Sequence, residues 1–295
     1  MSRAVPTSRG QAALRVAVAA AIALGASCGA APPPCKLALR DVHAAPLLWR
    51  VHGPGGGTVW LYGTIHDAGA EDVPAVVWTL LDAAPAFVSE LGDAEPDRRA
   101  LSEAARLPWG QVLDHLLSAD DWWALVTAML GVMSEEELRH ARPWFAMVRL
   151  IGHMARSPKP SMDEAMAEHA RQRGLAVLAL ESWEAQLAAL DASVTAGDLA
   201  KAIQGRLAVA CELTRLRSAY RTSDLPALAQ ALVGTVQREA LLAPRNRRWL
   251  PQIERYLAGG GAFIAVGLGH LLGDTGLVAM LERAGYTAER QAAAP

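Results

Sequence analysis

Short apolar runs alternate with longer stretches of helical periodicity from Leu47 to the C-terminus. Six of the runs have strand length, at residues 47–51, 59–62, 86–89, 175–180, 262–266 and 286–289. Between them, apolar residues recur at helical spacing, and Ser118, Ser134 and Ser161 begin sequences that are typical of helix N-terminal caps. This alternation predicts an α/β fold, with a mixed central sheet flanked by helices and a large helical insertion between about residues 102 and 170.

The sequence around these runs leads to three further expectations. Residues 52–57, His-Gly-Pro-Gly-Gly-Gly, are expected to join the first two strands as a hairpin. The run from Leu175 to Leu180 is apolar without interruption, which is typical of a strand buried on both faces. No inter-domain linker follows, so residues 47–290 are expected to form one domain.

The first 46 residues differ in composition from this domain. Arg3, Arg9 and Arg15 precede an apolar run at residues 16–24, which is the order found in an export signal. The run is shorter than the roughly 20 apolar residues that a membrane-spanning helix needs. Small residues then lead to Cys28, and the sequence Leu-Gly-Ala-Ser-Cys resembles a bacterial lipobox. The alternative is ordinary cleavage nearby that leaves Cys28 lost or unmodified.

These features predict a signal segment of the lipoprotein type at residues 1–28 and a linker at residues 29–46. The protein is then expected in the periplasm of a bacterial cell envelope, or attached to an envelope membrane through a lipidated Cys28. Cys35 and Cys211 would remain after processing, and an oxidising compartment would allow them to pair.

Composition narrows the classes of function. The chain has 295 residues, of which 52% are hydrophobic, and its 28 basic and 30 acidic residues give a net charge of −2. This balance lacks the basic excess of a nucleic-acid-binding surface, so no nucleic-acid partner is expected. With three cysteines and no Cys-x-x-Cys pair, the chemistry is expected to rest on histidines and carboxylates.

Four polar residues follow predicted strands at the points where the strands end: His66, Glu90, Glu181 and His270. If these strands are parallel, their carboxyl ends share one edge of the sheet, which is where open α/β sheets bind ligands. Two imidazoles and two carboxylates at one edge suit a divalent metal with an open position for water. They equally suit metal-free general acid–base catalysis, and the residue types leave both interpretations open.

Each of the two histidines ends a Gly-x-x-His sequence, at residues 63–66 and 267–270. Further short motifs lie in order along the chain: Ser89-Glu90-Leu91, Leu180-Glu181, Arg245-Asn246 and Gly273-x-x-Gly276. As an ordered set over roughly residues 47–289, these motifs resemble the TraB/GumN family. That family is related to the Tiki metalloproteases and, more distantly, to the ChaN and erythromycin-esterase proteins.

The resemblance implies an α/β fold with both Gly-x-x-His motifs at the active site and, for the Tiki branch, metal-dependent hydrolysis of peptide bonds. It implies that His66, Glu90 and His270 are the catalytic and metal-binding set, with Mn, Co or Zn as the ion and Glu181 nearby. Arg245 is expected to clamp an anion or to stabilise a developing oxyanion. The chain departs from the family at Asp67, where an apolar residue is common.

A dinucleotide-binding turn is a competing interpretation of Gly267-x-Gly269, with Glu289 about 20 residues on as the ribose-binding acid. Against it, the third glycine comes one position late, at Gly273, and His270 occupies the turn that should hold the pyrophosphate. The chain also has no Gly-x-Ser-x-Gly, His-Glu-x-x-His or Walker sequence. No nucleotide or organic cofactor is therefore expected.

Other charged residues have simpler interpretations. Asp163 and Glu164 are expected on the solvated side of a capped helix. The histidines at positions 115, 140, 153 and 169 are expected to be solvated or capping residues of the helical region.

The leading hypothesis is an exported, metal-dependent hydrolase that acts on a peptide or another acyl substrate. In it, His66 and His270 bind the metal or act as base and orienter, Glu90 activates water, and Glu181 supports them. The alternative is a non-catalytic envelope protein that binds a ligand or a protein in the same cleft.

Overall fold

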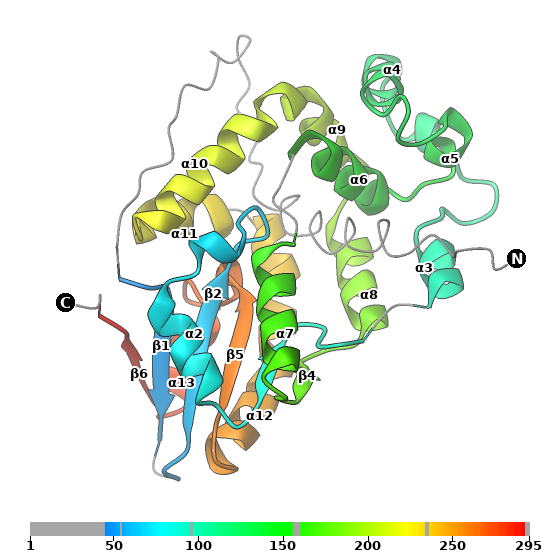
Figure 1. The fold of residues 1–295 in the computed structure, drawn as a ribbon. Coiled ribbons are helices and arrows are strands. Elements are labelled where there is room, and N and C mark those ends of the chain that lie inside the picture. The colour runs from blue at the N-terminus through cyan, green and yellow to red at the C-terminus, as the bar shows by residue number, and fades with distance from the viewer. Residues whose placement is uncertain (1–44, 54, 95–96, 156–159, 234–235, 293–295) are drawn as a thin grey trace, which may run out of the picture.

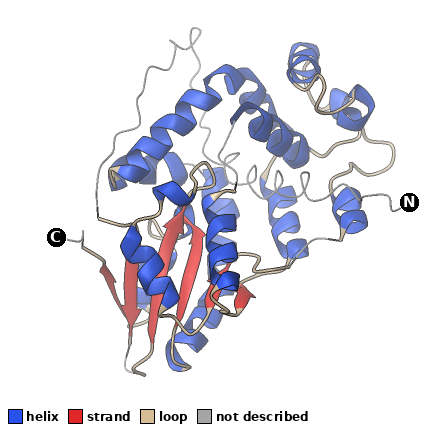
Figure 2. Cartoon of the chain, viewed as in Figure 1, coloured by secondary structure: helices blue, strands red, loops and turns tan. Residues whose placement is uncertain are grey.

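The structure is a computed structural model that describes residues 45–292, except positions 54, 95–96, 156–159 and 234–235. A mixed six-stranded sheet with the order β4-β3-β5-β2-β1-β6 lies at its centre (Figures 1 and 2). The strands are β1 (Leu48–His52), β2 (Thr58–Thr64), β3 (Phe87–Ser89), β4 (Val177–Ala179), β5 (Ala262–Gly267) and β6 (Thr287–Arg290). Each predicted run forms a strand, and the predicted α/β fold is confirmed.

Four neighbouring strands of this sheet are parallel. β5 pairs with β2 and with β3, and β3 pairs with β4, all in parallel, whereas β1 runs antiparallel to β2 and β6. Thr64 at the end of β2 lies in register with Gly267 of β5, and Ser89 of β3 lies in register with Ala179 of β4. The carboxyl ends of the four strands therefore meet at one edge of the sheet, as the site hypothesis requires.

Helices cover both faces of the sheet and extend beyond its carboxyl edge. The helices are α2 (Ala75–Asp82), α3 (Arg98–Ala104), α4 (Ala119–Ala128), α5 (Glu135–Arg139), α6 (Pro143–Ala155), α7 (Met162–Gln172), α8 (Trp183–Ser193), α9 (Ala196–Gly205), α10 (Val209–Arg221), α11 (Leu225–Val233), α12 (Val236–Ala258) and α13 (Leu277–Arg283). Short 3-10 helices are η1 (Ala70–Asp72), η2 (Leu113–His115), η3 (Arg206–Ala208) and η4 (Leu268–His270).

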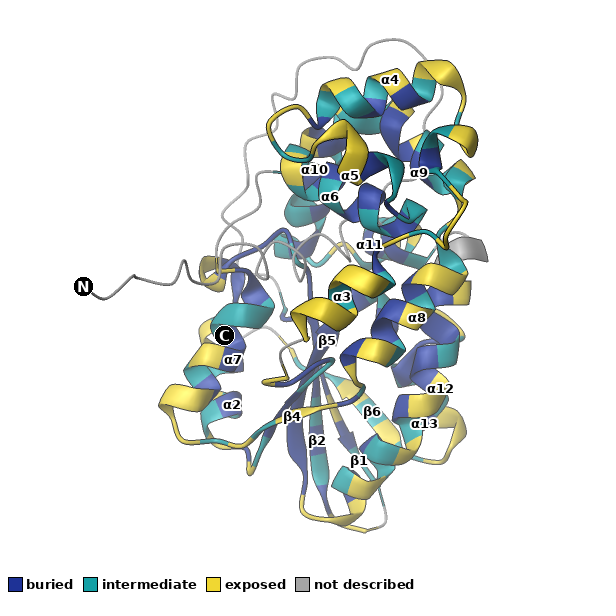
Figure 3. Ribbon diagram, turned by 90° about the vertical axis from the view of Figure 1, so that its right-hand side faces the viewer, coloured by how far each residue is buried: buried dark blue, intermediate teal, exposed yellow. Residues whose placement is uncertain are grey.

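Nine of these helices form three groups around the sheet. α2 and α7 lie on one face, and α12 and α13 lie on the other (Figures 1 and 3). α4, α5, α6, α9 and α10 form a helical layer beyond the carboxyl edge (Figure 3). This layer is larger than the predicted insertion, because α9 and α10 come from a later part of the chain.

The predicted helix starts are confirmed at three serines. The side chains of Ser118, Ser134 and Ser161 each accept a hydrogen bond from the backbone N–H three residues on, at the starts of α4, α5 and α7. At Ser134 and Ser161, the glutamate three residues on also accepts from the serine N–H, which completes a capping box.

β4 is not buried on both faces as its apolar run predicts. It is the edge strand of the sheet, and its three residues are partly or largely exposed, with Leu178 at 38%. An uninterrupted apolar run is compatible with an edge position as well as a central one, because the run describes side chains and not the pairing of the backbone.

Helix α12 begins earlier than predicted. The apolar pattern predicts a helix from Arg245, but α12 already begins at Val236 and contains Pro244 and Pro251. A proline often occupies the first turn of a helix, so the sequence around Pro244 is typical of a helix start even though the helix runs through it. Arg245 therefore lies in the middle of a 23-residue helix and not near its beginning.

The predictions of export and lipid attachment concern mostly the N-terminal residues. Cys28 and Cys35 lie outside the described residues, whereas Cys211 on α10 is disulfide-bonded. In the part of the chain that the structure describes, no helix combines the length and the hydropathy needed to span a bilayer.

Candidate functional site

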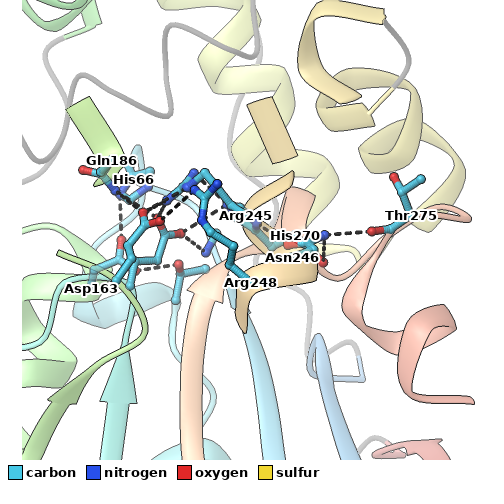
Figure 4. A network of polar contacts seen from close by, with 12 residues as sticks. His66, Asp163, Gln186, Arg245, Asn246, Arg248, His270 and Thr275 are labelled. Carbon is cyan, nitrogen blue, oxygen red and sulfur yellow. Dashed lines mark hydrogen bonds and ion pairs between the residues drawn. The ribbon is translucent and has the colours of Figure 1, made fainter. Parts of the chain in front are cut away.

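The predicted site residues gather at the carboxyl edge of the parallel strands (Figure 4). His66 follows β2, Glu90 follows β3, and His270 ends η4, which continues β5. Together with Arg245 of α12, these side chains line one cavity, and Glu181 lies directly behind Arg245. The structure thus brings the five predicted residues together, although they span 205 positions of the sequence from the first to the last (270 − 66 + 1).

Arg245 is the centre of this cluster. Its side chain is buried, and its Nε and Nη2 donate to Glu181 Oε1 at 2.9 and 2.5 Å. Nη2 also donates to Glu90 Oε2 at 2.6 Å, and the guanidinium lies 4.8 Å over the ring of Trp249. One cation therefore compensates two largely buried carboxylates.

The hydrogen bonds of Asn246 define the protonation state of His270 (Figure 4). Asn246 Nδ2 donates to the carbonyl oxygens of His270 and Thr275, at 3.1 and 2.8 Å, so its Oδ1 faces His270 Nδ1 at 2.6 Å as an acceptor. Nδ1 therefore carries the hydrogen, and the lone pair of Nε2 accepts from Arg245 Nη1 at 3.0 Å. Burial and the charge of Arg245 lower the pKa of His270 to about 3, so the imidazole is neutral.

His66 has the opposite electrostatic environment. Its Nδ1 forms an ion pair with Asp163 Oδ2 at 2.7 Å, and Thr64 Oγ1 donates to Asp163 Oδ1 at 2.6 Å. Burial alone would lower the pKa of His66, but the negative charges of Asp163 and Glu90 outweigh it and raise the pKa to about 9. The imidazole is therefore protonated at neutral pH.

The sequence predicts Asp163 on a solvated helix face, but the structure places it against His66. The capping box at Ser161 fixes the start of α7, and Met162 N–H donates to the carbonyl of Ala68 in the loop after β2 at 2.7 Å. These two contacts place the first turn of α7 beside His66. Asp163, which is in that turn, consequently points at the imidazole.

The pKa values of Glu90 and Glu181 are shifted in opposite directions, although both carboxylates bind Arg245. Burial would raise the pKa of Glu90, but Arg245, the two histidines and the N–H of Gly267, which donates to Oε1 at 2.9 Å, lower it to about 2. Burial raises the pKa of Glu181, and Arg245 only partly opposes it. Gln186 Nε2 donates to Glu90 Oε2 at 3.3 Å and so bridges toward Glu181.

The space between the reactive groups exists because residue 267 is a glycine. A methyl group at Gly267 would lie 3.3 Å from Glu90 Oε1, 3.8 Å from His270 Cδ2 and 4.0 Å from His66 Nε2. All three side chains therefore face the hydrogen that replaces this methyl group. A water molecule or a substrate atom placed there would lie close to the Glu90 carboxylate and to the His66 imidazole at the same time.

The predicted metal ligands are close together but do not have the arrangement of a metal site. Among the described residues, no group of three His, Cys, Asp or Glu side chains is placed to hold a metal ion. The lone pair of His270 Nε2 is engaged by Arg245, whose fixed positive charge would repel a divalent cation. Of these three residues, Glu90 and, after loss of its proton, His66 Nε2 remain as possible metal ligands. The metal at His66, Glu90 and His270 therefore stays a prediction from family resemblance.

Asp163 and Asn246 belong to the cluster, but the sequence alone does not predict a functional role for either residue. Asn246 belongs to the Arg245-Asn246 motif, which was a signal for it. Asp163 had only an indirect signal, the capping box that fixes the start of its helix.

A model of the TraB/PrgY/gumN family matches residues 47–290, so the chain belongs to this family. No curated protein and no solved structure matches the chain. The match covers all six strands and all five predicted site residues.

The pKa values of the two histidines should be shifted in opposite directions from the ordinary value. We expect His270 to keep a neutral ring with its hydrogen on Nδ1 down to about pH 3, and His66 to stay protonated up to about pH 9. Imidazole ¹⁵N chemical shifts measured as a function of pH test this, with His66→Gln and His270→Gln used to assign the signals. Two transitions near the ordinary value of about 6.5 would contradict the described environments.

Arg245→Met should destabilise the protein strongly. Because Glu90 and Glu181 would stay buried without their shared cation, we expect the free energy of unfolding to fall by about 3 to 5 kcal/mol. Urea denaturation followed by circular dichroism measures this change. Arg247→Met is the matched control, since Arg247 is exposed, and its effect should stay within about 0.5 kcal/mol. Equal losses in the two variants would refute the central role of Arg245.

Proposed function

We propose that this member of the TraB/PrgY/gumN family is a hydrolase that cleaves a peptide or similar acyl bond by acid–base catalysis with His66 and Glu90. One observation carries the proposal. Both groups face the space over Gly267, and their environments move the pKa of His66 to about 9 and that of Glu90 to about 2. Two titratable groups with pKa values moved apart in one cavity are the pattern of an acid and a base with separate roles.

In the proposed reaction, the Glu90 carboxylate orients a water molecule and takes one of its protons as the water oxygen attacks the carbonyl carbon. The protonated His66 donates its Nε2 hydrogen to the leaving nitrogen or oxygen as the acyl bond breaks. The proton on Glu90 then passes to His66, which restores both groups. Asp163 is a positioning residue in this scheme, because its ion pair holds the imidazole with Nε2 toward the cavity.

Arg245 is proposed to stabilise the negative charge that develops on the carbonyl oxygen. Its contacts with Glu90, Glu181 and His270 account for four of the five N–H hydrogens of a guanidinium. One Nη1 hydrogen is left over, and Arg245 lines the cavity. A preorganised donor of this kind typically contributes about 10²-fold or more to the rate.

The test is hydrolysis of a fluorogenic peptide library by the purified full chain at neutral pH. We expect His66→Gln to lower kcat/KM at least about 100-fold and Asp163→Asn about 10-fold or more, through loss of the acid and of its orientation. His115→Gln is the control, because His115 is exposed and outside the cavity, and should leave kcat/KM unchanged. Activity should be constant around neutral pH and fall as the pH rises through about 9, since His66 then loses its proton.

The outcomes separate this proposal from its competitors. Turnover that survives in both His66→Gln and Asp163→Asn rejects it. Turnover that is abolished by a chelator and restored by Mn²⁺, Co²⁺ or Zn²⁺ replaces the metal-free scheme by the metal-dependent one. Tight binding of a peptide without any turnover supports the binding-protein alternative.

We also propose that the chain is exported and attached to an envelope membrane through Cys28. The arginines and the apolar run before Cys28 support export, and the disulfide of Cys211 suits an oxidising compartment. Expression of the full chain in a bacterium should give a shortened product in the membrane fraction, with a lipid-modified N-terminus by mass spectrometry. Cys28→Ser should release the product from the membrane. An unshortened chain in the cytoplasmic fraction contradicts the proposal.

A further inference from the structure

The cavity has a second, apolar side that the acid–base scheme does not use. Four leucines line it: Leu213, Leu216, Leu232 and Leu242. They come from the three consecutive helices α10, α11 and α12, and each keeps at most 9% of its surface exposed. We refer to these four residues as the leucine wall.

The leucine wall reaches the reactive edge of the sheet at Gly269. A methyl group at Gly269 would lie 3.2 Å from Leu242 Cδ1 and 3.7 Å from Leu232 Cβ. Gly269 directly precedes His270, so the wall begins one residue from the buried imidazole. A group that packs on the leucines is therefore next to the atoms that would react over Gly267.

The charges of the cavity restrict what this group can be. Among the described residues that line the cavity, the acidic ones are Asp67, Glu90, Asp163 and Glu164. The basic ones are His66, Arg245 and His270, of which His270 is neutral. With His66 protonated, the lining still has two more negative than positive charges, and the wall itself offers no polar atom from its side chains. An anionic group is repelled there, and any charged group would lose its hydration.

We propose that the leucine wall is the specificity site of the enzyme and selects an uncharged aliphatic side chain next to the scissile acyl bond. That the bound group belongs to a substrate rests on the proposed function. The wall as a binding site for an aliphatic amide stands on the lining residues alone. The substrate class is thus a peptide or ester whose acyl residue is leucine-like, and not a free fatty acid.

Binding is tested first, without any need for turnover. The full chain is labelled with ¹³C in its leucine methyl groups and titrated with N-acetyl-leucinamide, N-acetyl-aspartamide and octanoate. We expect N-acetyl-leucinamide to shift the methyl signals of the four wall leucines, and the two anionic ligands to bind at least about tenfold more weakly. Octanoate binding as tightly as N-acetyl-leucinamide, or shifts confined to other leucines, would overturn the proposal.

Specificity is tested by a larger side chain that fills the part of the cavity next to the leucine wall. We expect the parent protein to prefer a leucyl over an alanyl substrate at least about tenfold in kcat/KM, since each buried methylene discriminates by roughly that factor. Leu216→Phe should reduce turnover of the leucyl substrate and spare the alanyl one. Lower stability alone would reduce both equally. Leu207→Phe is the matched control, because Leu207 is 69% exposed and outside the cavity.

The two tests distinguish failure of this inference from failure of the proposed function. Leucinamide binding at the wall that Leu216→Phe abolishes, with no turnover of any substrate, keeps the wall as a binding site and rejects the hydrolase. Turnover that depends on His66 but is indifferent to leucine, alanine and aspartate rejects the wall and keeps the hydrolase. If Leu216→Phe does not fold, Leu232→Phe provides the same comparison from α11.

Discussion

The buried guanidinium of Arg245 is the charge on which the site depends. Two carboxylates in an environment of low dielectric constant are stable in their charged form only with a counter-ion at hydrogen-bonding distance. Because a guanidinium is planar and its donors have fixed directions, it also determines the angle between Glu90, Glu181 and His270. A lysine would supply the same charge from one nitrogen, and it would not hold three acceptors in one plane.

The strands could be predicted because each is an apolar run of strand length between turn residues, and the parallel pairing of the central ones follows from the long helical connections. The order of the strands in the sheet could not be predicted from these runs. Leu178 is apolar like the residues of β5, but it lies at the sheet edge and is 38% exposed. Pro244 shows the same limit for helices, since a local signal for a helix start lies in the interior of α12.

The residues at the strand ends could be predicted because topology alone brings them to one edge. Their partners could not, because Asp163 of helix α7 meets Thr64 of strand β2 across 99 positions of sequence. The state of His270 was also beyond prediction. Its neutral form with hydrogen on Nδ1 follows from two carbonyl oxygens that fix the orientation of Asn246, and such a chain of contacts exists only in three dimensions.

The residues at the strand ends and the leucine wall come from different elements of the fold, and specific contacts join them. α10 is held to the sheet by Tyr220, whose hydroxyl donates to the carbonyl of Gly63 at 2.7 Å, and by Arg217, which donates to Asp72 at 2.8 Å. Gly63 and Asp72 flank the loop that carries His66. These contacts fix α10, which carries Leu213 and Leu216 of the wall, relative to the loop that carries His66. Substitution within the wall can then change which substrate fits while the acid–base pair keeps its geometry.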